Sequence, residues 1–120
     1  MWNYTAYMLW KYSEIVGESF NLRDFVNFVF VEVGRKQRIF FHDGERDLYG
    51  DLEYLKDLGA ITLKSEGNTV TIRVKKDVLS RIAKEVEEFP KRVKSDVLKD
   101  YINRINRALS DLAYSQRVLK

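Results

Sequence analysis

The sequence predicts a mainly helical protein with one small β-hairpin, an α+β fold, and three observations lead to this class. Apolar residues recur at intervals of three and four along several segments, which is the spacing of a helix face. Residues 61–75 instead alternate apolar and polar side chains on both sides of Gly67-Asn68, which predicts two strands joined by a turn. Residues 91–120 repeat apolar positions in sevens, which predicts one long helix.

The first two predicted helices occupy the N-terminal third of the chain. Residues 2–16 carry an apolar stripe, and Gly17 is placed to end that helix. Asn21 is a typical N-cap residue for a second helix, whose apolar face lies within 22–33. That second segment is also rich in strand-forming residues and is compatible with a buried strand. The cap signal and Gly34 at its far end favour the helix.

A third helix is expected over residues 45–58, after a connection of mixed character. Residues 35–38 form a basic cluster that we expect to be a loop, and residues 39–41 fit a short strand or a buried turn. Gly59 is placed to end the helix. The leucines expected to face the core are Leu48, Leu52, Leu55 and Leu58.

The C-terminal part is expected to be helical and to form a separate unit, giving domains at 1–76 and 77–120. Asp77 is expected to cap a helix that Pro90 breaks or kinks. The seam of the long helix that follows is narrow, so it should pack on another helix, either in a second copy or in residues 2–16 of the same chain. The seam residues are Leu98, Ile102, Ile105, Leu109, Leu112, Gln116 and Leu119. All but Gln116 are candidate dimerisation residues, and a homodimer is expected.

Composition excludes several classes of function. The chain has 120 residues with no cysteine and one histidine, which excludes disulfides, a thiol nucleophile and a His-rich metal site. No glycine-rich phosphate loop is present, so we expect neither an enzyme nor a bound cofactor or metal. No signal-peptide pattern and no apolar run of about 18 residues occurs. We therefore expect a cytoplasmic protein with no membrane partner.

The net charge of +3 conceals an uneven distribution. Residues 1–60 hold seven Lys and Arg against ten Asp and Glu, a net charge of −3. Residues 61–120 hold fourteen against eight, a net charge of +6. A basic half of this kind raises the prospect of a polyanionic partner such as nucleic acid.

Residues 48–61, Leu-Tyr-Gly-Asp-Leu-Glu-Tyr-Leu-Lys-Asp-Leu-Gly-Ala-Ile, carry a leucine cadence that ends at a glycine and leads into the hairpin. This stretch resembles the recognition helix and wing of winged helix-turn-helix proteins, with PadR-like regulators nearest and MarR-like ones next. The resemblance implies a winged-helix domain over 1–76, followed by a C-terminal coiled-coil helix for dimerisation. It also implies transcription regulation by binding to double-stranded DNA.

Eight residues are candidates for DNA contact. Three lie in the basic cluster, three on the polar side of the hairpin, and two on the exposed side of the third helix. In that order they are Arg35, Lys36 and Arg38; Lys64, Arg73 and Lys75; and Arg46 and Tyr49. Cations in such places neutralise phosphates and make affinity depend on salt. An ordinary solubilising surface is the simpler interpretation that remains open.

The third helix is acidic, which opposes entry into a major groove. Residues 43–58 contain six Asp and Glu against two Lys and Arg. This leaves an alternative function, a dimeric interaction module that docks a protein partner on residues 45–58 and binds no DNA. Asp43, Asp47 and Asp51 follow at intervals of four, and a solvated face explains them better than a divalent cation site. His42 is expected to be a loop or capping residue.

Overall fold

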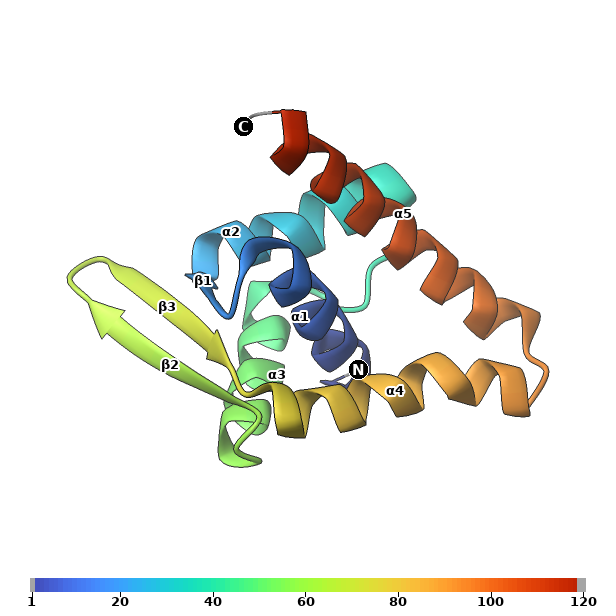
Figure 1. Ribbon diagram of the computed structural model, residues 1–120, viewed down its shortest axis with the longest axis horizontal. Helices are drawn as coiled ribbons and strands as arrows, with labels where there is room; N and C mark the ends of the chain where they lie inside the picture. Colours follow the sequence, from blue (N-terminus) through green and yellow to red (C-terminus); the bar gives the residue numbers. More distant parts are fainter. Residues whose placement is uncertain (1, 119–120) are drawn as a thin grey trace.

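The computed structural model describes residues 2–118 and is mainly helical, with a three-stranded antiparallel sheet at one end (Figure 1). In chain order its elements are α1 (Trp2–Val16), β1 (Ser19–Asn21), α2 (Leu22–Asn27), the π-helix η1 (Phe28–Arg35), α3 (Glu45–Asp57), β2 (Ile61–Glu66), β3 (Thr69–Val74), α4 (Lys76–Arg92) and α5 (Asp96–Val118). The predicted α+β class, mainly helical with a small hairpin, is confirmed.

Helix α1 lies at the centre of the molecule and has the predicted bounds (Figure 1). The consecutive residues Tyr7, Met8 and Leu9 are all buried, although they point in different directions around the helix. Helices α3, α4 and α5 all pack on α1, which explains burial on several sides. Gly17 ends the helix with a φ of +108°, and its N–H donates to the carbonyl of Ser13 at 2.8 Å. The residues before and after position 76 therefore share one core.

The second predicted helix is confirmed as helical, but it runs further than expected. The Asn21 side chain caps it by accepting a hydrogen bond from the N–H of Arg23 at 2.7 Å. The helix continues through Gly34 and ends near Arg38, whose φ is +58°. The expectation of a basic loop at 35–38 is therefore wrong. Gly34 allows close packing instead, because a Cβ there would lie 2.5 Å from Cε1 of Phe40.

Residues 39–44 form an irregular connection rather than a strand. Within it, Phe41 is buried and stacks on Tyr4 with 4.8 Å between ring centroids. Leu48, Leu52 and Leu55 of α3 face the core as predicted. Leu58 does not, because α3 ends at Asp57 and leaves the Leu58 side chain 44% exposed. Gly59 then adopts a φ of +78° and turns the chain into β2.

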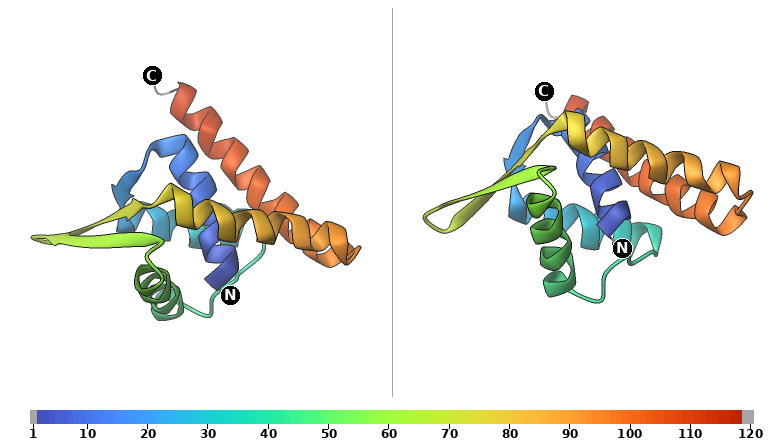
Figure 2. Two further views of the ribbon diagram at one scale, coloured as in Figure 1. Left: turned by 60° about the horizontal axis from the view of Figure 1, so that its bottom comes forward. Right: turned by 90° about the horizontal axis from the view of Figure 1, so that it is seen from below.

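The predicted hairpin forms, and a third strand joins it. The strand order is β1–β3–β2, and both pairings are antiparallel. The sequence pattern does not reveal β1, because three residues are too few to establish an alternation. Phe20 of β1 lies opposite Ile72 of β3 and joins the core side of the sheet. The hairpin extends away from the helices (Figure 2).

The C-terminal third forms two helices, with a break at residues 93–95. The expectation of one continuous helix over 91–120 is wrong, because α4 passes through Pro90 to Arg92 before the chain reverses. Lys94 has a φ of +52°, and the Ser95 hydroxyl accepts the N–H of Leu98 at 3.2 Å to cap α5. The N-cap of α4 is Lys75, so the expectation that Asp77 caps this helix is also wrong.

Candidate nucleic-acid interface

The hairpin presents a polar face to solvent, and its register determines which side chains share that face. Cross-strand partners in an antiparallel pair point to the same side, and successive residues alternate sides. Thr62 pairs with Arg73, and Lys64 pairs with Thr71. We call these four residues, together with Lys75 at the end of β3, the outer face. The structure thus places the three predicted hairpin cations, Lys64, Arg73 and Lys75, on one small element.

Two cations of the outer face have no carboxylate partner in the part of the chain that the structure describes. Arg73 and Lys75 are exposed and form no salt bridge within residues 2–118. Lys64 lies 3.0 Å from Glu66, but its side chain is 75% exposed and such exposed pairs are weak. These cations are therefore available to an anionic partner.

The first turns of α3 carry two more of the residues predicted to contact DNA, Arg46 and Tyr49. Arg46 is exposed and has no ion-pair partner among the described residues. Tyr49 is half-buried, and its hydroxyl accepts a hydrogen bond from Arg23 of α2 at 3.1 Å. The same guanidinium pairs with Glu45, and this hydrogen bond raises the pKa of Arg23. The sequence did not single out Arg23, which joins the start of α2 to α3.

The carboxylates of α3 are less available than their number suggests. Glu45 is paired with Arg23, and Glu53 lies 2.7 Å from Lys56, whose pKa this hydrogen bond raises. The side chain of Asp51 is only 15% exposed, so it turns away from the line it forms with Asp47 in the sequence. The negative charge presented to solvent is therefore smaller than the six carboxylates of residues 43–58 imply.

Asp51 instead belongs to a buried polar cluster with His42 and Thr5. Its Oδ2 accepts the Thr5 hydroxyl at 2.8 Å and lies 2.8 Å from His42 Nε2. Because a carboxylate only accepts, His42 Nε2 carries a proton in this contact. His42 is buried, and its Nδ1 has no hydrogen-bond partner in the described structure. His42 lies in a loop, as expected, and its buried side chain fastens the 39–44 connection to α1 and α3.

The cations at the end of η1 lie on a different part of the molecule. Arg104 of α5 donates to the backbone carbonyls of Gln37 and Arg38 at 3.0 and 3.3 Å, which holds this segment beside α5. Figures 1 and 2 show this segment well away from the hairpin. Lys36 pairs with Glu32 at 3.0 Å, whereas Arg35 is exposed without an ion-pair partner in the described range. The two predicted basic groups therefore do not form one surface.

The predicted seam of α5 packs mainly inside the chain. Ile102, Ile105 and Leu109 are buried against the common core, while Leu98 and Leu112 are half-buried. Leu119 lies outside the described residues. The Tyr7 hydroxyl donates to Asn106 Oδ1 at 2.7 Å and ties α1 to α5. Packing on α1, one of the two interpretations of the heptad pattern, thus accounts for the buried seam residues.

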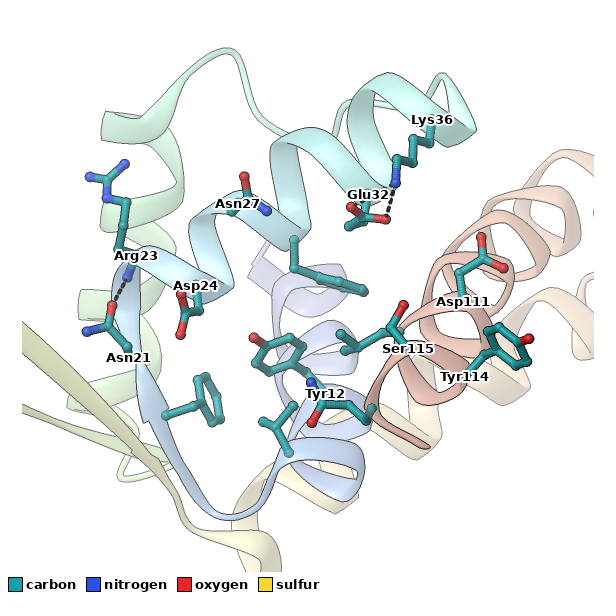
Figure 3. A pocket seen from close by; sticks show the side chains of 15 residues that line it. Tyr12, Asn21, Arg23, Asp24, Asn27, Glu32, Lys36, Asp111, Tyr114 and Ser115 are labelled. Atoms are coloured by element: carbon teal, nitrogen blue, oxygen red, sulfur yellow. Dashed lines mark hydrogen bonds and ion pairs between the residues drawn. The ribbon is translucent and has the colours of Figure 1, made fainter. Parts of the chain in front are cut away.

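A cleft of about 950 Å³ separates α2 and η1 from the end of α5 (Figure 3). Tyr12, Phe20 and Phe28 contribute aromatic rings to its lining. Burial raises the pKa of Tyr12 to about 12, so its hydroxyl is uncharged at neutral pH. Asp24 and Asp111 lie at its rim, and the Lys36 amine is occupied by Glu32. This cleft does not suit a polyanion.

Comparisons with known proteins found no match that bears on the function. No protein-family model, no curated protein and no solved structure matches the chain. Across residues 2–118, no helix combines the length and hydrophobicity needed to cross a bilayer. The same residues contain no group of three or more His, Asp or Glu side chains arranged to hold a metal ion.

Proposed function

We propose that the protein is a winged-helix DNA-binding protein that acts as a transcription regulator. The order α1–β1–α2–η1–α3–β2–β3 supports this class, because a helix leading through a glycine into a strand hairpin is what the sequence resemblance implies. The observation that carries DNA binding is the outer face of the hairpin. There, Arg73 and Lys75 stand exposed without carboxylate partners among the described residues.

The outer face binds the phosphate backbone in this proposal. Arg73 and Lys75 neutralise phosphates and release condensed counterions, with Lys64 exchanging Glu66 for a phosphate. The hydroxyls of Thr62 and Thr71 lie on the same face and can donate to phosphate oxygens. These contacts fix the position of the protein on the duplex but do not read its sequence.

Helix α3 docks shallowly and reads few bases. Arg46 in its first turn supplies the cation nearest the groove, while Asp47 and Asp57 keep the rest of the helix away from phosphates. Arg23 supports this arrangement by neutralising Glu45 at the start of the helix. The segment 35–38 lies too far along the molecule to share this footprint, and it adds only long-range attraction.

Paired alanine substitutions test where DNA binds. Arg73→Ala with Lys75→Ala should weaken binding to duplex DNA and reduce the slope of log K against log salt by about 1.8, because each lost phosphate contact removes about 0.9. Lys99→Ala with Arg107→Ala removes two exposed cations of α5 and is the matched control. This control should bind almost as wild type. Equal losses in the two double variants would show nonspecific attraction and overturn the assignment of the hairpin.

A protein-docking role for α3 is the second candidate, and exposed apolar side chains favour it. Tyr54 is 45% exposed, and its ring contacts that of Trp2 with 5.1 Å between centroids. Leu58 is also exposed beyond the end of the helix. Tyr54→Ser should leave DNA affinity unchanged if the hairpin binds DNA. A chain that binds no duplex even at low salt would favour the docking role instead.

A further inference from the structure

Helix α4 carries an apolar stripe that the rest of residues 2–118 leaves partly exposed. Leu79 and Val86 point into the core, but Phe89 and Val93 are 48% and 49% exposed. Val78 and Ile82 are half-buried and lie on the same side of the helix as Phe89. The stripe is therefore distinct from the face that packs on α1.

A groove of about 500 Å³ runs beside this stripe. Its apolar lining comes from Trp2 and Tyr4 of α1 and from Ile82, Val86 and Phe89 of α4. Trp2 is itself 37% exposed, so the groove joins the stripe into one apolar surface. Its volume and lining suit a large apolar side chain held at the surface of another helix.

The charges that flank the stripe are complementary to the same helix in the reverse direction. Arg81 and Glu88 lie seven residues apart, two turns along one edge of the stripe. Consider two α4 helices packed antiparallel about a two-fold axis between Lys84 and Glu85. Arg81 of each copy then lies opposite Glu88 of the other, which forms two symmetric ion pairs.

The same register also matches the apolar residues. Phe89 of one copy falls opposite Ser80 of the other, in the gap between Val78 and Ile82. Ile82 is one of the residues that line the groove, so the phenyl ring enters the apolar surface described above. A second copy thus satisfies both the charges and the shape of this surface with one arrangement.

We propose that the protein forms a homodimer by antiparallel packing of α4 against α4 of a second copy, with Phe89 inserted into the partner groove. This interface does not depend on DNA binding. It places the starts of the two α4 helices, and hence the two hairpins, on opposite sides of the axis, about 26 Å apart along the helices at 1.5 Å per residue. If the proposed function also holds, the two hairpins can reach positions about one DNA turn apart.

Charge reversal and rescue test this register by sedimentation equilibrium of the full chain. Arg81→Glu and Glu88→Arg, made singly, should each weaken dimerisation at least about tenfold, because two attractive pairs become two repulsive ones. The double variant should regain the wild-type dissociation constant. Among the described residues Arg81 forms no ion pair with Glu88, and its Nε donates to the Asp77 carbonyl at 3.1 Å, so a rescue points to a contact between two chains. A double variant weaker than either single variant would overturn the antiparallel register.

The apolar contact has its own test. Phe89→Asp should give a folded monomer, since the Phe89 side chain is already half-exposed in the single chain and circular dichroism should be unchanged. Val118→Asp is the matched control, a 63% exposed apolar residue at the far end of α5, and should remain dimeric. Wild-type protein that stays monomeric up to about 100 μM, or dimers lost in the control but not in Phe89→Asp, would overturn the proposal.

Discussion

Replacement of Asp51 by alanine is the most specific test of how α3 is held in place. The carboxylate accepts from the Thr5 hydroxyl and lies 2.8 Å from His42 Nε2. Without it, His42 Nε2–H can still turn to Thr5 Oγ1, also 2.8 Å away, but the hydrogen bond from the Thr5 hydroxyl to a carboxylate is lost. The loss of a buried hydrogen bond to a charged group should cost about 2–3 kcal/mol of unfolding free energy.

Urea denaturation monitored by tryptophan fluorescence measures this cost, with the m-value checked for constancy. Glu53→Ala is the control, because it removes from the same helix a carboxylate whose side chain is 58% exposed and paired with Lys56. It should change stability by no more than about 0.5 kcal/mol. Asp51→Asn keeps one acceptor and should fall between the two. An Asp51→Ala variant as stable as the Glu53→Ala control would refute the buried cluster.

Two further predictions concern backbone conformation and alkaline pH. Gly59→Ala should destabilise the protein by about 1–2 kcal/mol, because the φ of +78° is strained for alanine. Gly50→Ala, inside α3, should instead stabilise it by up to about 1 kcal/mol. Melting temperatures that shift in the same direction for both variants would contradict this. Burial raises the pKa of Tyr7 and Tyr12 from 10.0 to about 12, so their stabilising contribution is complete below pH 10 and is lost as pH rises towards 12. Urea midpoints should fall between pH 8 and pH 11, with a component of tyrosine absorbance that titrates only as the chain unfolds. The decline should be smaller in Tyr7→Phe, and an equal decline would remove Tyr7 as a cause.

Periodicity and glycine positions in the sequence predicted the helices and strands that depend only on their own residues. The bounds of α1 and the two strands of the hairpin follow from periodicity and from the glycines at 17, 59 and 67. Gly34 misled the prediction because a glycine can serve close packing as well as termination, and only the position of Phe40 distinguishes the two. Pro90 misled it for a related reason, since the helix tolerated the proline and broke three residues later.

Contacts between distant residues could not be predicted from spacing. Strand β1 forms because its backbone pairs with β3 some fifty residues later. Such a pairing produces no recognisable sequence pattern in a strand of three residues. The intervals of four placed Asp51 on a line with Asp47, but its partner His42 lies on a connection whose path only the fold determines. The heptad pattern of α5 likewise does not distinguish packing on α1 from packing on a second copy. The outer face of the hairpin was predictable because alternation alone assigns its side chains.

The salt dependence of duplex binding is the most direct test of whether the hairpin cations bind the DNA backbone. Fluorescence anisotropy with a labelled duplex of random sequence, repeated from about 50 to 200 mM salt, gives the number of phosphates neutralised. We expect binding at low salt that weakens steeply as salt rises, with a slope for two to three phosphates per chain, from Lys64, Arg73 and Lys75. Absence of binding at the lowest salt, or binding whose affinity does not change with salt, would contradict it.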